Sequence, residues 1–194
     1  MKVALINSRQ DKAGVNIRHH IEQLLTRDPS YGCRDRTYEF FDVEERLIHA
    51  EHIDAKIDAD LLIFLSRHYS VNPVPVLTVH VTGNFGTADV GGTPRTLAPA
   101  APVMMQATLR QLRKHCPEGY RVSYEVTHHG PTGLIHPSFF VEIGSTEKEW
   151  ADQDAARAVA QSVLSASPSH AAPLIGPGGR IYVGTVDGIL YALD

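Results

Sequence analysis

The stretch ADLLIFL, residues 59–65, indicates the fold class because nearly all of its side chains are apolar. A strand with one solvated face alternates apolar and polar residues, whereas a strand covered on both faces is apolar throughout. The stretch therefore predicts a central strand with a layer of structure on each side. We interpret the chain as an α/β protein, with a layered mixed sheet and flanking helices.

The segments before this strand fit the same interpretation. Residues 2–7 (KVALIN) predict a buried first strand, and residues 37–43 (TYEFFDV) predict another. Between them, apolar residues recur at the spacing of one helix face, at Ile17, Ile21, Leu24 and Leu25. The chain is thus expected to begin with a strand followed by a helix.

The segments after the central strand continue the alternation. Strands are predicted at residues 77–81, 120–127 and 138–143, and a helix at residues 103–115 after a loop rich in Gly and Pro. Thr146 and Glu149 form a capping-box pattern, which predicts the start of a final helix. Its expected core face carries Trp150, Ala155, Ala158, Val159, Ser162 and Val163.

The composition changes after Leu164. Residues 165–179 are rich in Pro, Gly and Ser without periodicity, which is typical of a linker. We expect an α/β domain over residues 1–164, this linker, and a β-hairpin over residues 180–194 that turns at Val186, Asp187 and Gly188.

Length and composition limit the classes of protein. The 194 residues are 43% hydrophobic and contain no apolar run near the ~20 residues of a membrane helix. The first ten residues lack the features of a signal peptide, so a cytoplasmic protein is expected. Cys33 and Cys116 have no C-x-x-C spacing, so we expect reduced thiols and no thiolate zinc site.

Charge and histidine content narrow the function. The net charge of −4 argues against DNA binding and against a broad nucleic-acid surface, so any RNA contact should be local. Histidine is unusually frequent, with eleven in the chain. Imidazole is a common metal ligand and general base, which gives weight to the six between residues 68 and 136: His68, His80, His115, His128, His129 and His136.

The segment SRHYS, residues 66–70, directly follows the predicted central strand. Ligands of open α/β sheets usually bind at strand ends, which makes Ser66, His68 and Ser70 candidates for a site. The alternative is a capped turn in which the hydroxyl groups satisfy the main chain.

The segment HVTGNFG, residues 80–86, is open to two interpretations. His80 lies within a strand, where a core histidine is more frequent than a ligand. The glycines of TGNFG would let main-chain amides approach an anion or nucleotide, but the same residues also form simple tight turns.

The segment EVTHHGP, residues 125–131, is the strongest candidate for chemistry. A bend at Gly130 and Pro131 would let His128, His129 or both enter a cleft. Together with Glu125 or Glu142 they would match the histidine and carboxylate set of a catalytic zinc site. The spacing matches no known zinc motif, and acid–base catalysis without a metal is equally compatible.

Five strings in the chain also carry a family resemblance. They are SRHYS at Ser66, LTVHVTGNFG at Leu77, GGTP at Gly91, THHGPT at Thr127 and PSFFVEIGSTEKEW at Pro137. Over residues 1–164 the chain resembles the archaeal and plant type of D-aminoacyl-tRNA deacylase. The resemblance implies a fold related to peptidyl-tRNA hydrolases and phosphorylases, and a zinc-dependent hydrolysis of the ester that joins a D-amino acid to tRNA.

The resemblance also implies roles for residues and partners. A zinc ion would be held by His128 and His129 with His80 or Glu142, and the reaction centre would be lined by Ser66, His68, Glu125 and Thr127. Substrate contacts are expected from Ser70, Thr82, Gly83, Asn84, Phe85, Gly86, Gly130, Pro131 and Thr132. A monomer is expected to hold the acceptor end of tRNA, with phosphate contacts from Arg67, Arg95, Arg110, Arg113 and Lys114.

The C-terminal stretch departs from the family pattern. A glycine-rich segment expected after the last helix is absent, and residues 180–194 resemble one repeat of a quinoprotein-type β-propeller. We therefore expect weakened or absent deacylase activity as one possibility. Two alternatives stay open: a noncatalytic remnant that binds RNA ends or a protein, and a zinc-dependent hydrolase of small N-acyl or peptide substrates.

Overall fold

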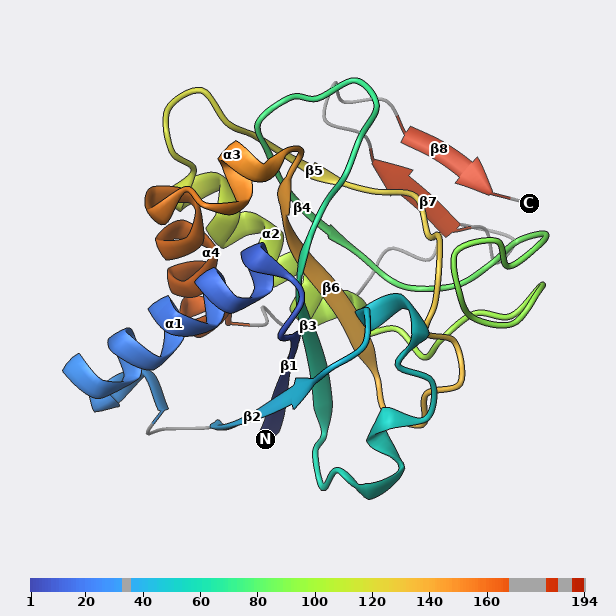
Figure 1. The fold of residues 1–194 in the computed structure, drawn as a ribbon, viewed down its shortest axis with the longest axis horizontal. Coiled ribbons are helices and arrows are strands. Elements are labelled where there is room, and N and C mark those ends of the chain that lie inside the picture. Colours follow the sequence, from blue (N-terminus) through green and yellow to red (C-terminus); the bar gives the residue numbers. More distant parts are fainter. Residues whose placement is uncertain (33–35, 168–180, 185–189, 194) are drawn as a thin grey trace.

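The computed structural model is described for all residues except 33–35, 168–180, 185–189 and 194. Its centre is a six-stranded sheet in the order β2-β1-β3-β6-β4-β5 (Figure 1). The strands are β1 (Lys2–Ser8), β2 (Thr37–Val43), β3 (Leu61–Arg67), β4 (Val76–His80), β5 (Arg121–Tyr124) and β6 (Ser138–Gly144). The predicted α/β class with a mixed sheet is confirmed.

The strand directions make the sheet mixed. β2, β1, β3 and β6 pair in parallel, and β4 and β5 are parallel to each other. β4 pairs with β6 in the antiparallel direction. The first six residues of β3 are buried, as the run of apolar residues predicts for a central strand.

The helices cover one face of the sheet. They are α1 (Lys12–Arg27), α2 (Pro102–His115), α3 (Glu147–Trp150) and α4 (Gln153–Ser165), and Figure 1 shows them gathered on one side. Their apolar residues form one core with alternate residues of the strands, among them Leu61, Ile63 and Leu65 of β3. The intervening residues of β3, Leu62 and Phe64, therefore face away from the helices.

Irregular segments cover the opposite face. A second, smaller core there joins Phe64 and Phe140 to Leu47, Ile57 and Leu134. These last three residues come from segments outside the strands. Leu47 begins the short 3-10 helix η2 (Leu47–His49), and Ile57 directly follows the 3-10 helix η3 (Ile53–Lys56). We call this side of the sheet the loop face. Elsewhere in the chain, a further 3-10 helix, η1 (Pro29–Gly32), follows α1.

Two predicted elements differ from the structure. The strand expected over residues 120–127 ends at Tyr124, so the two histidines lie in an irregular segment rather than directly at a strand end. The capping box of Thr146 and Glu149 is present, but its helix ends at Trp150. A separate helix begins after Asp152, whose carboxylate caps it by accepting from the main-chain N–H groups of Asp154 and Ala155.

The C-terminal residues are described in part. β7 (Ile181–Gly184) and β8 (Leu190–Leu193) pair in the antiparallel direction, as a hairpin requires. The predicted turn and most of the predicted linker lie outside the described residues, as does Cys33. Cys116 is a free thiol. None of the helices in the described ranges is long and apolar enough to span a bilayer.

Candidate active site on the loop face

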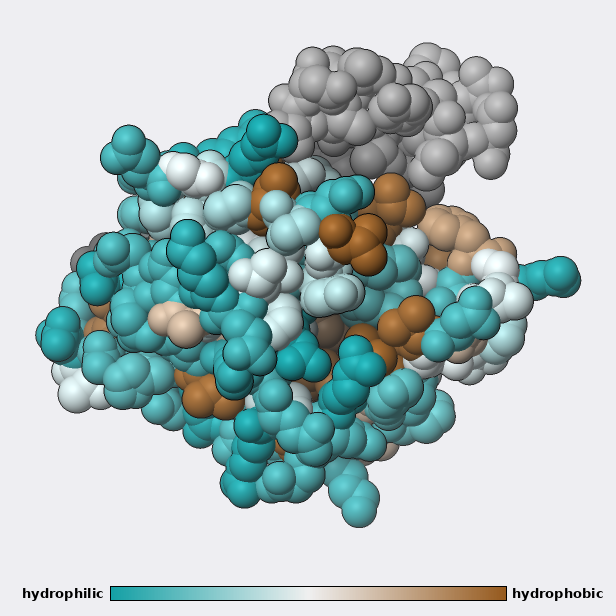
Figure 2. All heavy atoms as spheres, turned by 45° about the horizontal axis from the view of Figure 1, so that its top comes forward, coloured by the Kyte–Doolittle hydropathy of each residue, from teal (hydrophilic) through white to brown (hydrophobic). Residues whose placement is uncertain are grey.

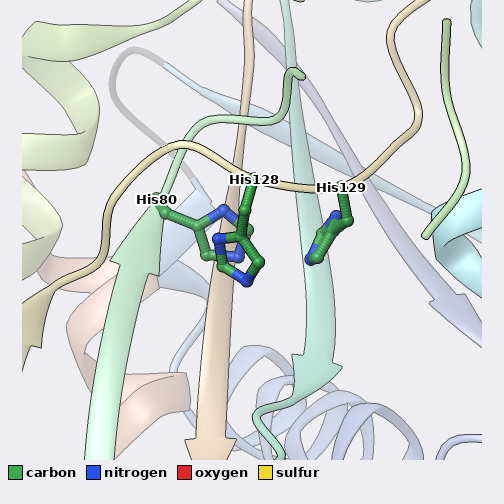
Figure 3. Close-up of side chains that lie close together, drawn as sticks. All are labelled: His80, His128 and His129. Atoms are coloured by element: carbon green, nitrogen blue, oxygen red, sulfur yellow. The ribbon is translucent and has the colours of Figure 1, made fainter. Parts of the chain in front are cut away.

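Three histidines meet on the loop face of the sheet. His80 is the last residue of β4, and His128 and His129 lie in the segment after β5. Their ring centroids are 4.5 Å apart for His80 and His128, 4.9 Å for His80 and His129, and 4.5 Å for His128 and His129. Figure 3 shows the three rings gathered together, from the end of the strand and from the loop that crosses it. We call them the histidine cluster.

The hydrogen bonds of the cluster orient its ring nitrogens. Each Nδ1 lies near a main-chain carbonyl oxygen: 3.1 Å for His80 and Val81, 2.7 Å for His128 and Val126, and 2.6 Å for His129 and Gly130. A carbonyl can only accept, so Nδ1 carries the proton in each ring and Nε2 is the nitrogen that remains available. The orientation is the one that metal-ligating histidines adopt.

The buried side chain of His80 gives independent evidence for a ligand site. Its side chain is fully buried, and its Nε2 has no hydrogen-bond partner in the structure. A buried polar atom without a partner is costly, and native proteins retain few of them outside functional sites. The interpretation of His80 as an ordinary core histidine is thus weaker than the interpretation as a ligand.

A second group, which we call the carboxylate group, adjoins the cluster. It consists of His68, Glu125 and Glu142. His68 Nδ1 lies 3.0 Å from Glu125 Oε1 and 3.7 Å from Glu142 Oε2, and the shorter contact is an ion pair without hydrogen-bond alignment, since Glu125 Oε1 has no hydrogen-bond partner. The same Glu142 oxygen is 3.6 Å from His80 Nε2, so Glu142 joins the two groups.

The sheet register explains why these residues meet. Glu142 of β6 lies opposite Ser66 of parallel β3 and opposite Thr78 of antiparallel β4. Within β6, Val141 and Ile143 join the helix-side core, so Glu142 faces the loops. The site therefore lies on the loop face, over β6 and beside the ends of β3, β4 and β5.

Opposite charges shift the acidity of the carboxylate group. Contacts with Glu125 and then with Glu142 raise the pKa of His68 to about 10. Burial alone would raise the pKa of Glu142, but the charges of His80 and His68 hold it well below its usual range. Burial works in the same direction on Glu125, but the contact with His68 outweighs it and lowers the pKa of Glu125. Both carboxylates are consequently ionised at neutral pH.

The pKa values of two members of the histidine cluster shift in opposite directions. Burial lowers the pKa of His80, but the neighbouring Glu142 charge outweighs it and raises the pKa overall. Burial and the charge of His80 lower the pKa of His129 to about 4. His129 is therefore a neutral imidazole at pH 7, the form that can donate a lone pair.

The donor atoms fit a bound cation. One ligand atom from each residue of the histidine cluster lies within 4.8 Å of the others, and the carboxylate group meets the same condition. Nitrogen donors from three histidines with an adjacent carboxylate are the ligands that Zn²⁺ prefers. The orphaned Nε2 of His80 supports this fit independently of the spacing.

Several predicted site residues serve the scaffold instead. Ser66 Oγ donates to Asp11 Oδ2 at 3.1 Å, and Ser70 Oγ accepts from Asn72 N, as in the capped-turn interpretation. Thr82 Oγ1 donates to Pro131 O, and Thr132 Oγ1 accepts from Thr93 N. These four hydroxyl groups fix loops and strand ends around the site.

The expected anion-binding amides are also occupied. The amide of Gly83 donates to His129 O and that of Asn84 donates to Thr96 O, while the Asn84 side chain donates to Gly91 O and Thr93 O. Thr127 is half-buried, and its methyl group would lie 3.0 Å from a Cβ at Gly83. Phe85 and Gly86 are exposed.

The sequence interpretation missed three residues that shape the site. Thr78 is buried, and its hydroxyl has no hydrogen-bond partner. The strand period of two places Thr78 on the same face as His80, a signal that is readable in the sequence. Glu51 and Asp54 accept hydrogen bonds from main-chain amides of the segment after the histidines. No local sequence pattern predicts such long-range hydrogen bonds.

Large apolar side chains are exposed near these segments. They include Tyr69, Phe85, Leu97, Val126 and Ile135, each more than half exposed. Figure 2 shows the apolar residues of one face as separate patches among hydrophilic ones. Val126, one of these exposed residues, directly follows Glu125 in the chain.

Comparison with known proteins gives a consistent family. A family model described as D-aminoacyl-tRNA deacylase matches residues 55–191, and so extends past residue 164, where we expected the resemblance to end. A protein of Methanoregula boonei named D-aminoacyl-tRNA deacylase is 70% identical over 183 residues, which are 94% of this chain and 42% of that protein. The chain thus spans less than half the length of this curated relative.

A further relative supports the same assignment, and a solved structure supports the fold. A protein of Archaeoglobus fulgidus with the same name is 39% identical over 193 residues, which cover 92% of this chain and 69% of the relative. The crystal structure of a conserved protein of unknown function is 37% identical, with a TM-score of 0.75, and the match covers 86% of this chain and 62% of that one.

Proposed function

The chain belongs to the D-aminoacyl-tRNA deacylase family, and from this premise we propose that it hydrolyses the ester bond of D-aminoacyl-tRNA. The products would be the free D-amino acid and tRNA. The single observation that carries the proposal is the histidine cluster beside ionised Glu142, with the Nε2 of buried His80 lacking a partner. Such a set suits hydrolysis, which needs an activated water and a means of moving protons.

We propose Zn²⁺ as the cofactor of this site. His80, His128 and His129 would hold it through Nε2, with Glu142 adjacent. When bound, zinc supplies a Lewis acid that polarises the ester carbonyl and makes a water molecule more acidic. The carboxylate group also has three donors and would accept a cation of the same kind.

The remaining groups would orient water and substrate. Glu125 and Glu142 would accept hydrogen bonds from a water molecule through their carboxylate oxygens. His68 contacts both carboxylates and would supply a proton to the leaving oxygen of the ribose. The unpartnered hydroxyl of Thr78 faces the same space and is available for a further hydrogen bond.

The acceptor end of tRNA would approach over the loop face. Exposed Phe85 and Val126 offer apolar surface for the amino acid or the terminal base. Arg95 remains a candidate for phosphate contacts. Arg67 is a weaker one, because it lies over the ring of Trp150, which belongs to the helix-side core. Arg110, Arg113 and Lys114 belong to α2 on the opposite face of the sheet, so they are poor candidates for binding the same end.

We extend the proposal to a monomer in the cytoplasm. We also propose that residues 180–194 resemble one repeat of a β-propeller. If this stretch replaces part of the reaction centre, the chain is a remnant that binds RNA ends. Activity of the 194-residue chain therefore separates the enzyme from this second candidate.

The test is release of D-tyrosine and L-tyrosine from matched aminoacyl-tRNAs. We expect release of the D form only, with loss of at least about 100-fold in rate after chelation or in His128→Ala, because the Lewis acid that the cation would supply is removed or loses a ligand. His115→Ala is a matched control, since His115 lies on α2. Equal release of both forms, or undiminished release from His128→Ala, would contradict the proposal.

The same assay addresses the alternatives. No release above buffer from a folded chain that binds zinc would favour the RNA-binding remnant. Turnover of small N-acyl or peptide esters in the absence of tRNA would favour the third candidate, a hydrolase of small substrates.

A further inference from the structure

The segment that carries two members of the histidine cluster has no regular secondary structure. Residues 125–137 connect β5 to β6 without helix or strand. His128 and His129 thus lack the ladder of main-chain bonds that holds His80 at the end of β4. Another set of contacts must fix their main chain if their rings are to meet a ligand repeatedly in one geometry.

Glu51 supplies such contacts from a distant part of the chain. Its Oε1 accepts from the amide of Thr132 at 2.8 Å, and its Oε2 accepts from the amide of Gly133 at 2.5 Å. The amide of His52 donates back to Gly133 O at 3.1 Å. One half-buried carboxylate thereby binds two consecutive amides, three and four residues after His129.

Close packing presses the segment against the residues around Glu51. A Cβ added at Gly130 would lie 2.4 Å from Ile48 O, and one at Gly133 would lie 2.5 Å from the His52 ring. Gly130 is needed for this approach, because the atoms that a side chain there would meet belong to the main chain; at Gly133 they belong to the side chains of His52 and Glu51. The contact surface runs from Ile48 to His52, and the Glu51 carboxylate accepts its two hydrogen bonds from Thr132 and Gly133.

The main chain at His129 is strained. Its φ is +49°, a left-handed conformation that residues other than glycine seldom adopt. Such a conformation persists only where the surroundings hold it in place. Besides Glu51, the bonds from Gly83 N to His129 O and from Gly130 N to Val90 O hold the same stretch.

We propose that Glu51 is a positioning residue that fixes His128 and His129 for the proposed cation. The inference rests on the metal site of the proposed function and goes beyond it, because Glu51 itself touches neither the ring cluster nor the carboxylate group in any described contact. It acts through Thr132 and Gly133, by holding the segment in the conformation that brings the two imidazoles beside His80.

The experiment compares Glu51→Ala and Glu51→Gln with two controls. Glu45→Ala removes an exposed carboxylate from the same region of the chain. Asp54→Asn alters a buried carboxylate that binds the amides of Ile135 and His136, farther along the segment. For each protein, zinc affinity is measured by competition with a chelator, and metal-free stability by urea unfolding.

We expect zinc affinity to fall about 10- to 100-fold in Glu51→Ala, the range seen when groups that orient metal ligands are removed. Glu51→Gln keeps one acceptor oxygen, so its loss should be smaller. Glu45→Ala should match the wild type, and Asp54→Asn should lose stability with less than about a threefold loss of affinity. Wild-type affinity in Glu51→Ala, or an equal loss in Asp54→Asn, would overturn the proposal.

A second measurement does not depend on zinc binding. Nitrogen NMR spectra of the imidazoles in the metal-free protein should give one Nδ1-protonated form each for His128 and His129. The signals are assigned with the variants His128→Ala and His129→Ala. Glu51→Ala should average these signals, and unchanged signals would overturn the inference. If the wild type bound no zinc, the metal part of the proposed function would fail, while these spectra would still test Glu51. If Glu51→Ala does not fold, Glu51→Gln carries both tests.

Discussion

At the scale of single residues, the site keeps polar atoms that the fold alone does not require. Thr78 is 2% exposed and its hydroxyl has no hydrogen-bond partner, which is an unfavourable arrangement for a structural residue. Its position opposite Glu142 gives the hydroxyl a use in the proposed reaction. Function and stability should therefore respond in opposite ways when this hydroxyl is removed.

We expect Thr78→Val to leave the free energy of unfolding unchanged or to raise it by up to about 1 kcal/mol, because an unsatisfied buried hydroxyl is replaced by a methyl group. The same change should lower kcat for D-aminoacyl-tRNA about tenfold. Urea unfolding and initial rates measure the two effects. Thr108→Val, which alters another unpartnered buried hydroxyl on α2, is the control and should leave kcat unchanged. A stability loss above about 1 kcal/mol would count against the interpretation.

At the scale of elements, one carboxylate ties the first helix to the central strand. Asp11 Oδ1 accepts from the amides of Ala13 and Gly14 and caps α1, while Oδ2 accepts from Ser66 Oγ and Arg67 N of β3. The approach is close, since a Cβ added at Gly14 would lie 2.4 Å from Leu65 O. The cap thus also orients the strand end that leads to His68.

Two substitutions separate these roles. Asp11→Asn retains an oxygen for the cap but replaces the acceptor of the Arg67 amide, and should cost about 1–3 kcal/mol of unfolding free energy. Asp11→Ala removes both and should cost about 1 kcal/mol more. Urea unfolding of the two variants beside Thr146→Ala, a cap on the four-residue α3, provides the comparison. Equal costs for the Asn and Ala variants would show that the cap contributes nothing.

At the scale of the whole molecule, buried carboxylates hold the irregular layer on the sheet. Asp54 is 1% exposed and accepts from the amides of Ile135 and His136 and from His136 Nδ1. Burial would raise the pKa of Asp54, but these hydrogen bonds outweigh it and lower the pKa below its ordinary value. The folded state therefore favours the ionised form, and the loop layer should be sensitive to acid.

The sign of the pH effect follows from the lowered pKa. The stabilisation by Asp54 is fully present above about pH 4 and is lost as the pH falls through the folded pKa. We expect Asp54→Asn to cost about 2 kcal/mol at pH 7. The difference from the wild type should shrink below about pH 4. Unfolding free energies across pH 3 to 7 test this, with Asp58→Asn, an exposed carboxylate, as the control. A difference independent of pH would contradict the argument.

Much of the architecture was readable along the chain because local signals agree with the fold. The strands near residues 2–7, 37–43 and 59–65 follow the apolar patterns, and Thr146 with Glu149 forms its capping box. The final helix was misjudged because Asp152 interrupts it with a new cap, which competes with the continuous apolar face. The spacing of apolar residues alone does not show whether the helix continues or whether a new one begins at the Asp152 cap.

The chemical types of the site were also present in the sequence, since the histidines, the carboxylates and the family strings are local properties of the chain. Their assembly was not, because His68, His80, Glu125 and Glu142 are far apart and meet only through the register of β3 and β4 on β6. The same holds for Glu51, whose bonds span 81 and 82 residues. Strand pairing and long-range hydrogen bonds depend on the folded chain as a whole, and no local pattern encodes which atoms they bring within reach.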